Sequence, residues 1–203
     1  MTAFKKLPKS FYTRSDVVQI ARELLGKYLV TDINDKITVG KIVETEAYCG
    51  ATDKACHAHL NKKTNRTKIM FEEGGVAYVY LVYGMYKLFN IVTNEYGKAD
   101  AVLIRAVEPI EGIETMLERR KMEKIKRNLT AGPGIMSIAM GIHLSDYGQN
   151  LTENRIWIED RNEKIIKNQI IASARVNIDY AEEDKDLPWR FRIKDNKWTS
   201  PAK

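Results

Sequence analysis

The sequence contains little cysteine, with Cys49 and Cys56 the only two in 203 residues. Two cysteines cannot build the disulfide framework of a small secreted domain, and this scarcity is typical of a reducing compartment. No apolar run approaches the ~20 residues that a membrane-spanning helix needs, and the first residues lack the apolar segment of a secretory signal. We therefore expect a cytoplasmic protein with no signal peptide and no membrane partner.

Several catalytic signatures are also missing. The chain contains no G-x-x-x-x-G-K-[ST], G-x-G-x-x-G, G-x-S-x-G or H-E-x-x-H, so nucleotide-dependent, serine-hydrolase and zinc-protease mechanisms lose their usual support. No repeat, low-complexity tract or Pro/Gly/Ser-rich linker divides the chain. We predict one domain over residues 1–203, which is long enough to bury a full hydrophobic core.

Hydrophobic spacing predicts an α+β fold. Helices are expected over 16–25, with Ser15 as the N-cap, over 110–120, and from Pro133 to near Gly141. Runs rich in β-branched and aromatic residues predict strands at 28–31, 37–48, 76–83, 87–92, 101–107, 156–158, 170–178 and 190–193. Neighbouring strands joined by short turns favour an antiparallel or mixed sheet flanked by helices.

Two carboxylates one residue apart lie in the strand predicted at 37–48. Strand geometry places Glu44, Glu46 and Tyr48 on one face, with the two glutamates roughly 7 Å apart. An exposed edge strand would tolerate this pattern. A catalytic site would use one carboxylate for chemistry and the other to tune or support it. The stretch alone leaves both readings open.

Tyr83-Gly84-Met85 follows a tyrosine-rich strand and predicts the turn of a hairpin. Tyrosines are common in half-buried sheets, which would account for Tyr78 and Tyr80. A large ring at a hairpin tip is harder to explain as core, because such tips face solvent. The alternative is an aromatic wedge that enters a minor groove and unstacks a base step.

Arg105 interrupts the apolar strand at 101–107. A buried, unpaired guanidinium is costly, so this side chain must face water, pair with an acid or reach a ligand phosphate. Glu108 points to the opposite face of the strand, so an acidic partner would come from elsewhere.

The net charge is +6, and six cations fall within residues 119–127. This segment is either a solvated helix end or a patch that contacts phosphates. Cys49, Cys56, His57 and His59 offer zinc-type ligands, but their spacing matches no standard finger. A histidine that contacts a ligand, or one satisfied within a loop, is the preferred interpretation of His57.

A carboxylate base without a nucleophile triad favours activation of water. Aromatic surfaces and cations nearby favour a nucleobase on a phosphate chain as the substrate. At these residues the chain resembles the alkyladenine (3-methyladenine) DNA glycosylase family. The matching segments include K-I-V-E-T-E-A-Y at 41–48, D-K-A-C-H at 53–57, A-Y-V-Y-L-V-Y-G-M-Y at 77–86, V-L-I-R-A-V-E-P at 102–109, L-T-A-G-P-G at 129–134 and L-P-W-R-F at 187–191.

The resemblance implies a single domain with a curved, mainly antiparallel sheet and a protruding hairpin. It also implies a monofunctional enzyme of base excision repair that acts as a monomer on double-stranded DNA containing damaged purines. Alkylated or deaminated purines would be flipped out of the duplex and released, leaving an abasic site. No metal or organic cofactor is expected, and DNA would hold the protein near the nucleoid of a prokaryotic cytoplasm.

The resemblance further assigns roles residue by residue. Glu46 would be the general base that activates water for attack on C1′, with Glu44 in a supporting or tuning role. The substrate-binding residues would be Tyr48, His57, Tyr80 and Asn90. The DNA-binding residues would be Tyr83, which intercalates, together with Met85, Arg105 and Arg66.

The chain departs from the family pattern at a few positions. Ile135 stands where the family often has lysine, Asn177 where it usually has glycine, and Asn65 and Thr67 differ on either side of Arg66. Two alternatives are a protein that binds lesions without hydrolysing them and an RNA-binding module that stacks bases on the same tyrosines. The presence of Glu46 argues against the first.

Overall fold

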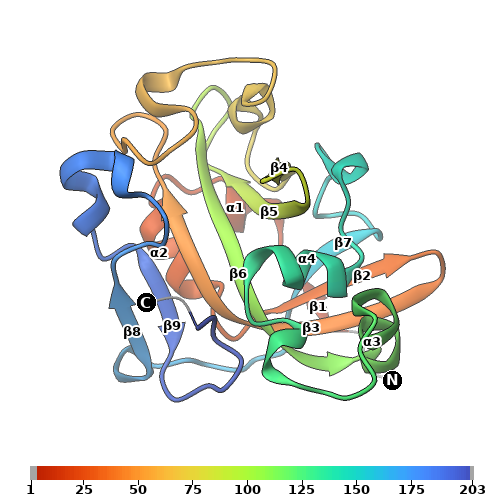
Figure 1. Cartoon of the computed structure of the whole chain (residues 1–203). Helices are drawn as coiled ribbons and strands as arrows, with labels where there is room; N and C mark the ends of the chain where they lie inside the picture. The colour runs from red at the N-terminus through yellow and green to blue at the C-terminus, as the bar shows by residue number, and fades with distance from the viewer. Residues whose placement is uncertain (1–3, 202–203) are drawn as a thin grey trace.

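The computed structural model describes residues 4–201, and within them the strands form one open, antiparallel sheet (Figure 1). Its main path runs in the order β1-β7-β2-β3-β6-β5-β4, while β9 pairs with β3 and β8 pairs with β9. The strands are β1 Lys5–Lys6, β2 Tyr28–Ile33, β3 Lys36–Tyr48, β4 Ala77–Val82, β5 Tyr86–Thr93, β6 Asp100–Glu111, β7 Ile156–Asp160, β8 Ile170–Ser173 and β9 Arg190–Ile193.

Four short α-helices flank this sheet in the described part of the chain: α1 Lys9–Tyr12, α2 Val17–Glu23, α3 Ile113–Arg120 and α4 Pro133–Met140. Short 3-10 turns lie at His59–Asn61, Lys68–Phe71, Arg127–Leu129, Leu144–Asp146, Lys167–Gln169 and Asp179–Asp186. The predicted α+β fold with a mainly antiparallel sheet is confirmed. No helix within residues 4–201 is both long enough and apolar enough to cross a membrane.

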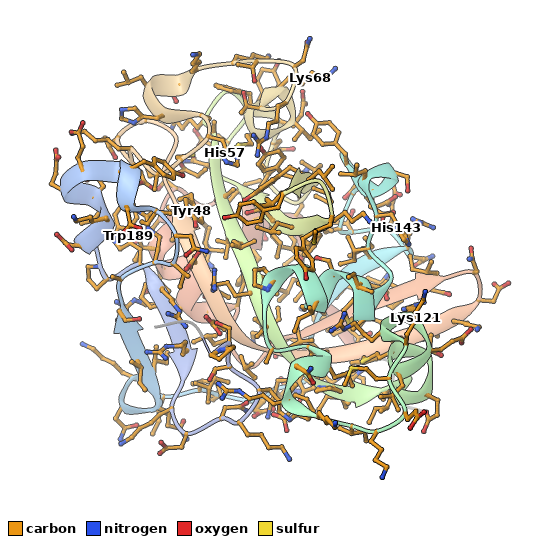
Figure 2. The ribbon with its side chains drawn as sticks, viewed as in Figure 1. Tyr48, His57, Lys68, Lys121, His143 and Trp189 are labelled. Carbon is orange, nitrogen blue, oxygen red and sulfur yellow. The ribbon has the colours of Figure 1, made fainter. Side chains whose placement is uncertain are left out.

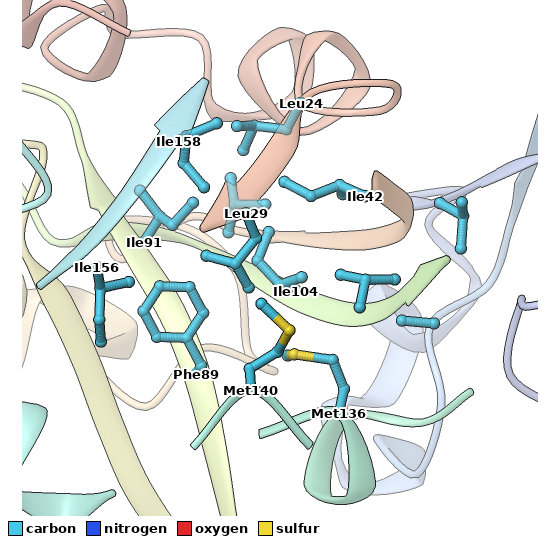
Figure 3. Packing of buried hydrophobic residues seen from close by; sticks show 14 of the residues in the cluster. Leu24, Leu29, Ile42, Phe89, Ile91, Ile104, Met136, Met140, Ile156 and Ile158 are labelled. Atoms are coloured by element: carbon cyan, nitrogen blue, oxygen red, sulfur yellow. The ribbon is translucent and has the colours of Figure 1, made fainter. Parts of the chain in front are cut away.

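The helices and the sheet enclose one large core. Leu24, next to α2, and Met136 and Met140 of α4 converge on Ile42 and Ile104 of the central strands, all fully buried (Figure 3). Burying one such side chain stabilises the fold by roughly 1.5–3 kcal/mol. The central strands are therefore held rigidly by close packing against the helices.

β3 lies in the middle of the sheet and has partners along both edges. β6 runs along one edge, while β2 and then β9 occupy the other. The register against β6 shifts between Ile42 and Glu44 and again between Glu44 and Thr45, as a β-bulge does. Every residue from Ile42 to Ala47 is buried as a result, which excludes the exposed edge strand considered for Glu44 and Glu46.

Three predicted boundaries are wrong. The N-cap of α2 is Asp16 rather than Ser15, and its side chain accepts the backbone N–H of Gln19. The helix expected from residue 110 begins at Ile113, because β6 continues to Glu111 and Gly112 turns the chain at φ +69. A Cβ on Gly112 would lie 2.2 Å from the Ile37 carbonyl oxygen, so only glycine fits there.

The strand expected over 170–178 is the third error, because β8 ends at Ser173. Residues 174–178 leave the ladder instead, and Asn177 adopts the left-handed backbone with φ 58. Asparagine tolerates this conformation better than other non-glycine residues. The segment that leaves the sheet here turns out to border the candidate site.

The predicted hairpin is confirmed. β4 and β5 pair from Ala77↔Ile91 to Val82↔Tyr86, and the Met85 N–H donates to the Val82 carbonyl at 3.2 Å. Three residues, 83–85, connect the paired strands, and Tyr83 and Gly84 both have positive φ, at 51 and 69, so the chain reverses through left-handed backbone. The tip exposes 77% of Tyr83 and 60% of Met85, so neither side chain belongs to the core.

Candidate active site

Glu44 is fully buried and surrounded by donors. Its Oε1 accepts from Arg105 Nε at 2.9 Å, from Arg190 Nε at 2.8 Å and from Ser200 Oγ at 2.8 Å, while Oε2 accepts the Ser200 backbone N–H. Burial alone would raise the pKa of Glu44, but the two arginines and Ser200 outweigh it and lower the pKa. This carboxylate is saturated by protein groups and has a structural role.

Glu46 is also fully buried, but its partners differ. The Tyr48 hydroxyl donates to Oε2 at 2.7 Å, and the Val176 backbone N–H donates to Oε1 at 2.9 Å. Arg105 Nη1 lies 3.2 Å from Oε1. Three donors from β3, β6 and the segment after β8 thus fix the orientation of this carboxyl group. Burial and then the adjacent Glu46 raise the pKa of Tyr48 well above its usual value, so its phenol keeps the proton it donates.

Arg105 resolves the question raised by its place in an apolar strand. It is 5% exposed and bridges the two carboxylates of β3, which are the acidic partners expected from elsewhere in the chain. Its side chain also borders the open groove described below. The contacts observed are to acids, and the phosphate contact implied by the resemblance stays a prediction.

An aromatic cluster lies next to Glu46. The His57 and Tyr80 ring centroids are 4.7 Å apart, and Tyr78 and Tyr80 are 5.1 Å apart. A cavity of about 40 Å³ lies between these rings, Tyr48 and Asn90. The structure therefore brings all four predicted substrate-binding residues together, and Figure 2 shows Tyr48 and His57 on the same side of the molecule.

Two hydrogen bonds fix the floor and side of this cavity. The Asn90 Nδ2 group donates to the Tyr78 carbonyl at 3.1 Å, across the β4–β5 pairing. His57 Nδ1 lies 2.9 Å from the Tyr78 hydroxyl. Sequence reasoning treated Tyr78 as a sheet residue only, although its place two residues before Tyr80 on the same strand face was the available signal. Burial raises the pKa of Tyr78 to about 12.

Arg66 covers the aromatic cluster from the solvent side. Its guanidinium lies over the Tyr80 ring at 4.7 Å, and Nη2 is 3.4 Å from His57 Nε2. Burial of the ring, and secondly the charge of Arg66, lower the pKa of His57 to about 4. His57 keeps more than a third of its surface exposed, so solvent weakens this effect.

A groove of about 730 Å³ extends from these residues towards the hairpin. Its walls include Arg66, Tyr80, Tyr83, Arg105 and the start of α4. Met85 is exposed at the hairpin tip and is not part of the groove wall. A second cavity of about 780 Å³ lies between α2 and residues 163–170, away from Glu46. The chemistry of the wall, and not the volume, therefore identifies the first groove as the candidate site.

The zinc alternative gains no support from the geometry. Within residues 4–201 no group of three or more His, Cys, Asp or Glu side chains could hold a metal ion. Cys56 is buried, with its thiol directed at the Ala99 carbonyl, and burial raises the pKa of that thiol. The imidazole of His57 contacts Tyr78 and Arg66 instead of the cysteines.

Comparison with known proteins decides the family. The sequence profile described as methylpurine-DNA glycosylase matches residues 10–197, nearly the whole chain. The chain belongs to the methylpurine-DNA glycosylase family. Members of this family are DNA repair enzymes that process alkylation damage, and the protein is accordingly a DNA glycosylase, which hydrolyses N-glycosyl bonds.

Relatives match along their full length. A protein of Clostridium novyi is 47% identical over 203 residues, which cover 97% of this chain and 98% of the relative. A protein of Alkaliphilus oremlandii is 48% identical over 202 residues, and one of Chlamydia felis is 47% identical over 188 residues, which cover 92% of this chain and 95% of the relative. Each is named "Putative 3-methyladenine DNA glycosylase".

Two departures from the family pattern lie in the groove wall of this glycosylase. Ile135 occupies the first turns of α4, and Asn177 is exposed in the segment after β8. The left-handed backbone of Asn177 is one that glycine adopts freely and that asparagine tolerates, so either residue fits at this place. Ile135 leaves an apolar side chain where a lysine would add a positive charge to the groove.

The basic segment of the glycosylase, residues 119–127, is divided in its contacts. Arg119 donates to the Ala139 carbonyl, Arg120 to the Asn128 carbonyl and Arg127 to the Thr199 carbonyl. These arginines hold the chain together, whereas Lys124 and Lys126 are exposed. If the segment contacts phosphates, the lysines are the residues that can do so.

Proposed function

We propose that the protein flips alkylated or deaminated purines out of double-stranded DNA and hydrolyses their N-glycosidic bond with a water activated by Glu46. The observation that carries this proposal is the buried Glu46 carboxyl group, held by the Val176 N–H, by Arg105 and by the hydroxyl of Tyr48, whose side chain lines the aromatic cavity. Three fixed donors hold the carboxylate in one orientation before substrate arrives, which is the requirement for a positioned base.

The reaction balances without a cofactor. Glu46 accepts a proton from water as the water oxygen forms a bond to C1′ of the flipped nucleotide. The C1′–N bond breaks, and its electron pair leaves with the base. A cationic alkylated purine thereby leaves as a neutral base, whereas hypoxanthine leaves as an anion that takes up a proton from solvent or the one that Glu46 accepted. The products are a free base and an abasic site. An alkylated purine already carries positive charge, so it leaves more readily than a neutral purine.

The aromatic cavity is the proposed site for the flipped base. Tyr48, Tyr80 and His57 supply ring faces, and electron-rich rings favour a cationic base by about 0.5–2 kcal/mol. Asn90, which is buried and donates to the Tyr78 carbonyl, is the proposed residue that opposes the exocyclic amine of guanine. A cavity of about 40 Å³ cannot hold a purine. The side chains that line it must therefore move apart when the base enters.

The hairpin is the proposed DNA wedge. Flipping a nucleotide costs a few kcal/mol, least for a damaged or mispaired base. Tyr83, the most exposed aromatic of the hairpin, restores part of the lost stacking by filling the vacated space. Met85 contacts a groove of the DNA beside Tyr83, and Arg66 and Arg105 face the phosphate chain along the protein cleft that they line. A monomer contains all of these parts, and DNA binding would keep it at the nucleoid.

The names of the relatives make 3-methyladenine the first substrate to test, with other damaged purines beside it. The experiment is base release from a duplex with one methylated purine or one hypoxanthine, comparing wild type with Glu46→Gln. Alkaline cleavage reveals abasic sites. We expect Glu46→Gln to lose about 10²–10⁴-fold in the single-turnover rate and to retain affinity for the lesion duplex. Base release by Glu46→Gln at the wild-type rate would exclude Glu46 as the base.

A further inference from the structure

An ion pair between Asp53 and Arg175 lies beside the proposed base pocket and has no part in the chemistry described above. Both side chains are fully buried. Arg175 Nη2 donates to Asp53 Oδ1 at 2.8 Å, and Nη1 donates to Oδ2. The guanidinium and the carboxylate therefore meet in the two-pronged geometry that gives the strongest and most directional contacts of this kind.

The other contacts of Arg175 converge on Glu46 and Tyr48. Its Nη1 donates to the carbonyl of Ala47, the residue between them, at 3.0 Å. Its guanidinium lies 4.8 Å from the Tyr48 ring centroid and 5.2 Å from that of Trp189, which lies near Tyr48 in Figure 2. The next residue, Val176, donates its N–H to Glu46. One arginine thus fixes the carboxyl group and the ring from two directions.

Residues 174–178 have no ladder to hold them, because β8 ends at Ser173. Their position next to Glu46 rests on side-chain contacts, and the buried ones come from Arg175 and from Ile178, which packs against Ala55 and Tyr48. Asp53 anchors the opposite loop, since its Oδ1 also accepts the Ala55 N–H at 2.9 Å. Arg175 closes the arrangement by donating to the Asp184 carbonyl at 3.1 Å. The pair therefore joins the loop before His57 to the segment that carries Val176.

We propose that Arg175, held by Asp53, is a positioning residue for the glycosylase reaction. It sets the Val176 N–H against Glu46 and the Tyr48 ring against the flipped base, without touching either reactant. The inference rests on the proposed role of Glu46. Its expected signature is a slower chemical step at unchanged DNA affinity, because the displaced groups act on the water and on the base after capture.

Arg175→Lys tests this proposal, because lysine keeps the charge but cannot reach Asp53, Ala47 and Asp184 with one rigid fork. A displacement of about 1 Å in a reacting group can slow a reaction about 10²-fold, so we expect a loss of that order in single-turnover excision of hypoxanthine. Affinity for a duplex with a tetrahydrofuran abasic analogue should equal that of wild type. Asp53→Asn, which keeps the shape of the side chain, should show a smaller loss of the same type.

Arg161→Lys is the matched control. Arg161 pairs with Glu159 and Glu111 and lies against two rings, Phe4 and Tyr28, but at the β7 end of the sheet. If this variant loses activity in step with its melting temperature and Arg175→Lys follows the same relation, Arg175 is only a stability element and the proposal is overturned. A wild-type excision rate in Arg175→Lys overturns it as well.

Folding and mechanism are separated by two further comparisons. If Arg175→Lys fails to fold, Asp53→Asn decides: a slower rate at unchanged affinity supports the proposal. Failure of both to fold overturns it in favour of a stability role. Glu46→Gln is measured in parallel. Full activity in Glu46→Gln refutes the proposed function itself, whereas an inactive Glu46→Gln beside a fully active Arg175→Lys refutes only the positioning role.

Discussion

Glu44 and Glu46 are both glutamates, they are separated by one residue on β3, and they are equally buried. Their surroundings nevertheless differ. Glu44 faces two arginines and both donors of Ser200. Glu46 faces Tyr48, a loop N–H and the shared Arg105, next to an aromatic cavity. Residue type and burial therefore do not separate the structural carboxylate from the one proposed as the catalytic base. Their neighbours do.

The largest expected effect is the loss of stability when Glu44 is replaced. Glu44→Gln leaves the guanidinium groups of Arg105 and Arg190 without their shared carboxylate, and removing one partner of a buried pair costs about 3–5 kcal/mol. Glu46→Gln should cost less, because Arg105 keeps Glu44. The free energies of unfolding from urea titrations check this order. Equal losses for the two variants would show that both carboxylates are structural.

The hairpin tip should behave in the opposite way. Tyr83→Ala removes an exposed ring, so the free energy of unfolding should change by less than about 0.5 kcal/mol. Affinity for a lesion duplex should fall by about 1–3 kcal/mol, the value of one stacked base. Tyr78→Ala, on the same hairpin but 2% exposed, is the control and should destabilise the fold by about 3–5 kcal/mol. If Tyr83→Ala unfolds as easily as Tyr78→Ala, the ring is part of the core and not a wedge.

The exposed lysines of the basic segment offer a smaller test. Each phosphate contact adds about 0.9 to the slope of log affinity against log salt concentration. Replacing Lys124 and Lys126 by alanine should reduce the slope by about 2 if both contact DNA. Lys164 and Lys167, which line the cavity away from Glu46, provide the control pair. An unchanged slope in the Lys124/Lys126 variant would assign the segment to solvent.

The difference between the two regions also explains what the sequence could predict. Helices, strands and the hairpin were found from periodicity and turn chemistry, because these are local properties. The four residues named from the resemblance, Tyr48, His57, Tyr80 and Asn90, line one cavity, while their binding of a base stays a prediction. Two donors to Glu44 could not be predicted from the sequence, because Arg190 and Ser200 lie 146 and 156 positions after Glu44 and no local pattern marks them.

The segment after β8 is a second place where the sequence alone did not predict the structure. Residues 170–178 alternate like a strand, yet the ladder stops at Ser173. The Arg175 side chain then points inward to Asp53, a residue far away in sequence. Tertiary pairing of a buried charge overrides local strand propensity here. Both errors concern long-range contacts with the two glutamates of β3, and such contacts leave no local pattern in the sequence.

His57 lines both the groove and the aromatic cavity, and it provides the smallest effect. Its pKa falls from 6.5 to about 4 in the folded protein, first through burial of the ring and then through Arg66. The unfolded chain therefore binds the proton first as pH falls. The stability linked to neutral His57 is complete above pH 6.5 and is lost between about pH 6.5 and pH 4. Partial exposure of the residue reduces the size of this loss.

The free energy of unfolding between pH 7.5 and pH 4 should consequently fall less steeply for His57→Gln than for wild type. His59→Gln removes a histidine from the same loop and serves as the control for the lost side chain. Parallel curves for wild type and His57→Gln would mean that His57 takes up its proton equally well in the folded state. Arg66 could then not hold the ring neutral over the base pocket, and the contact between them would have no electrostatic consequence for the entering base.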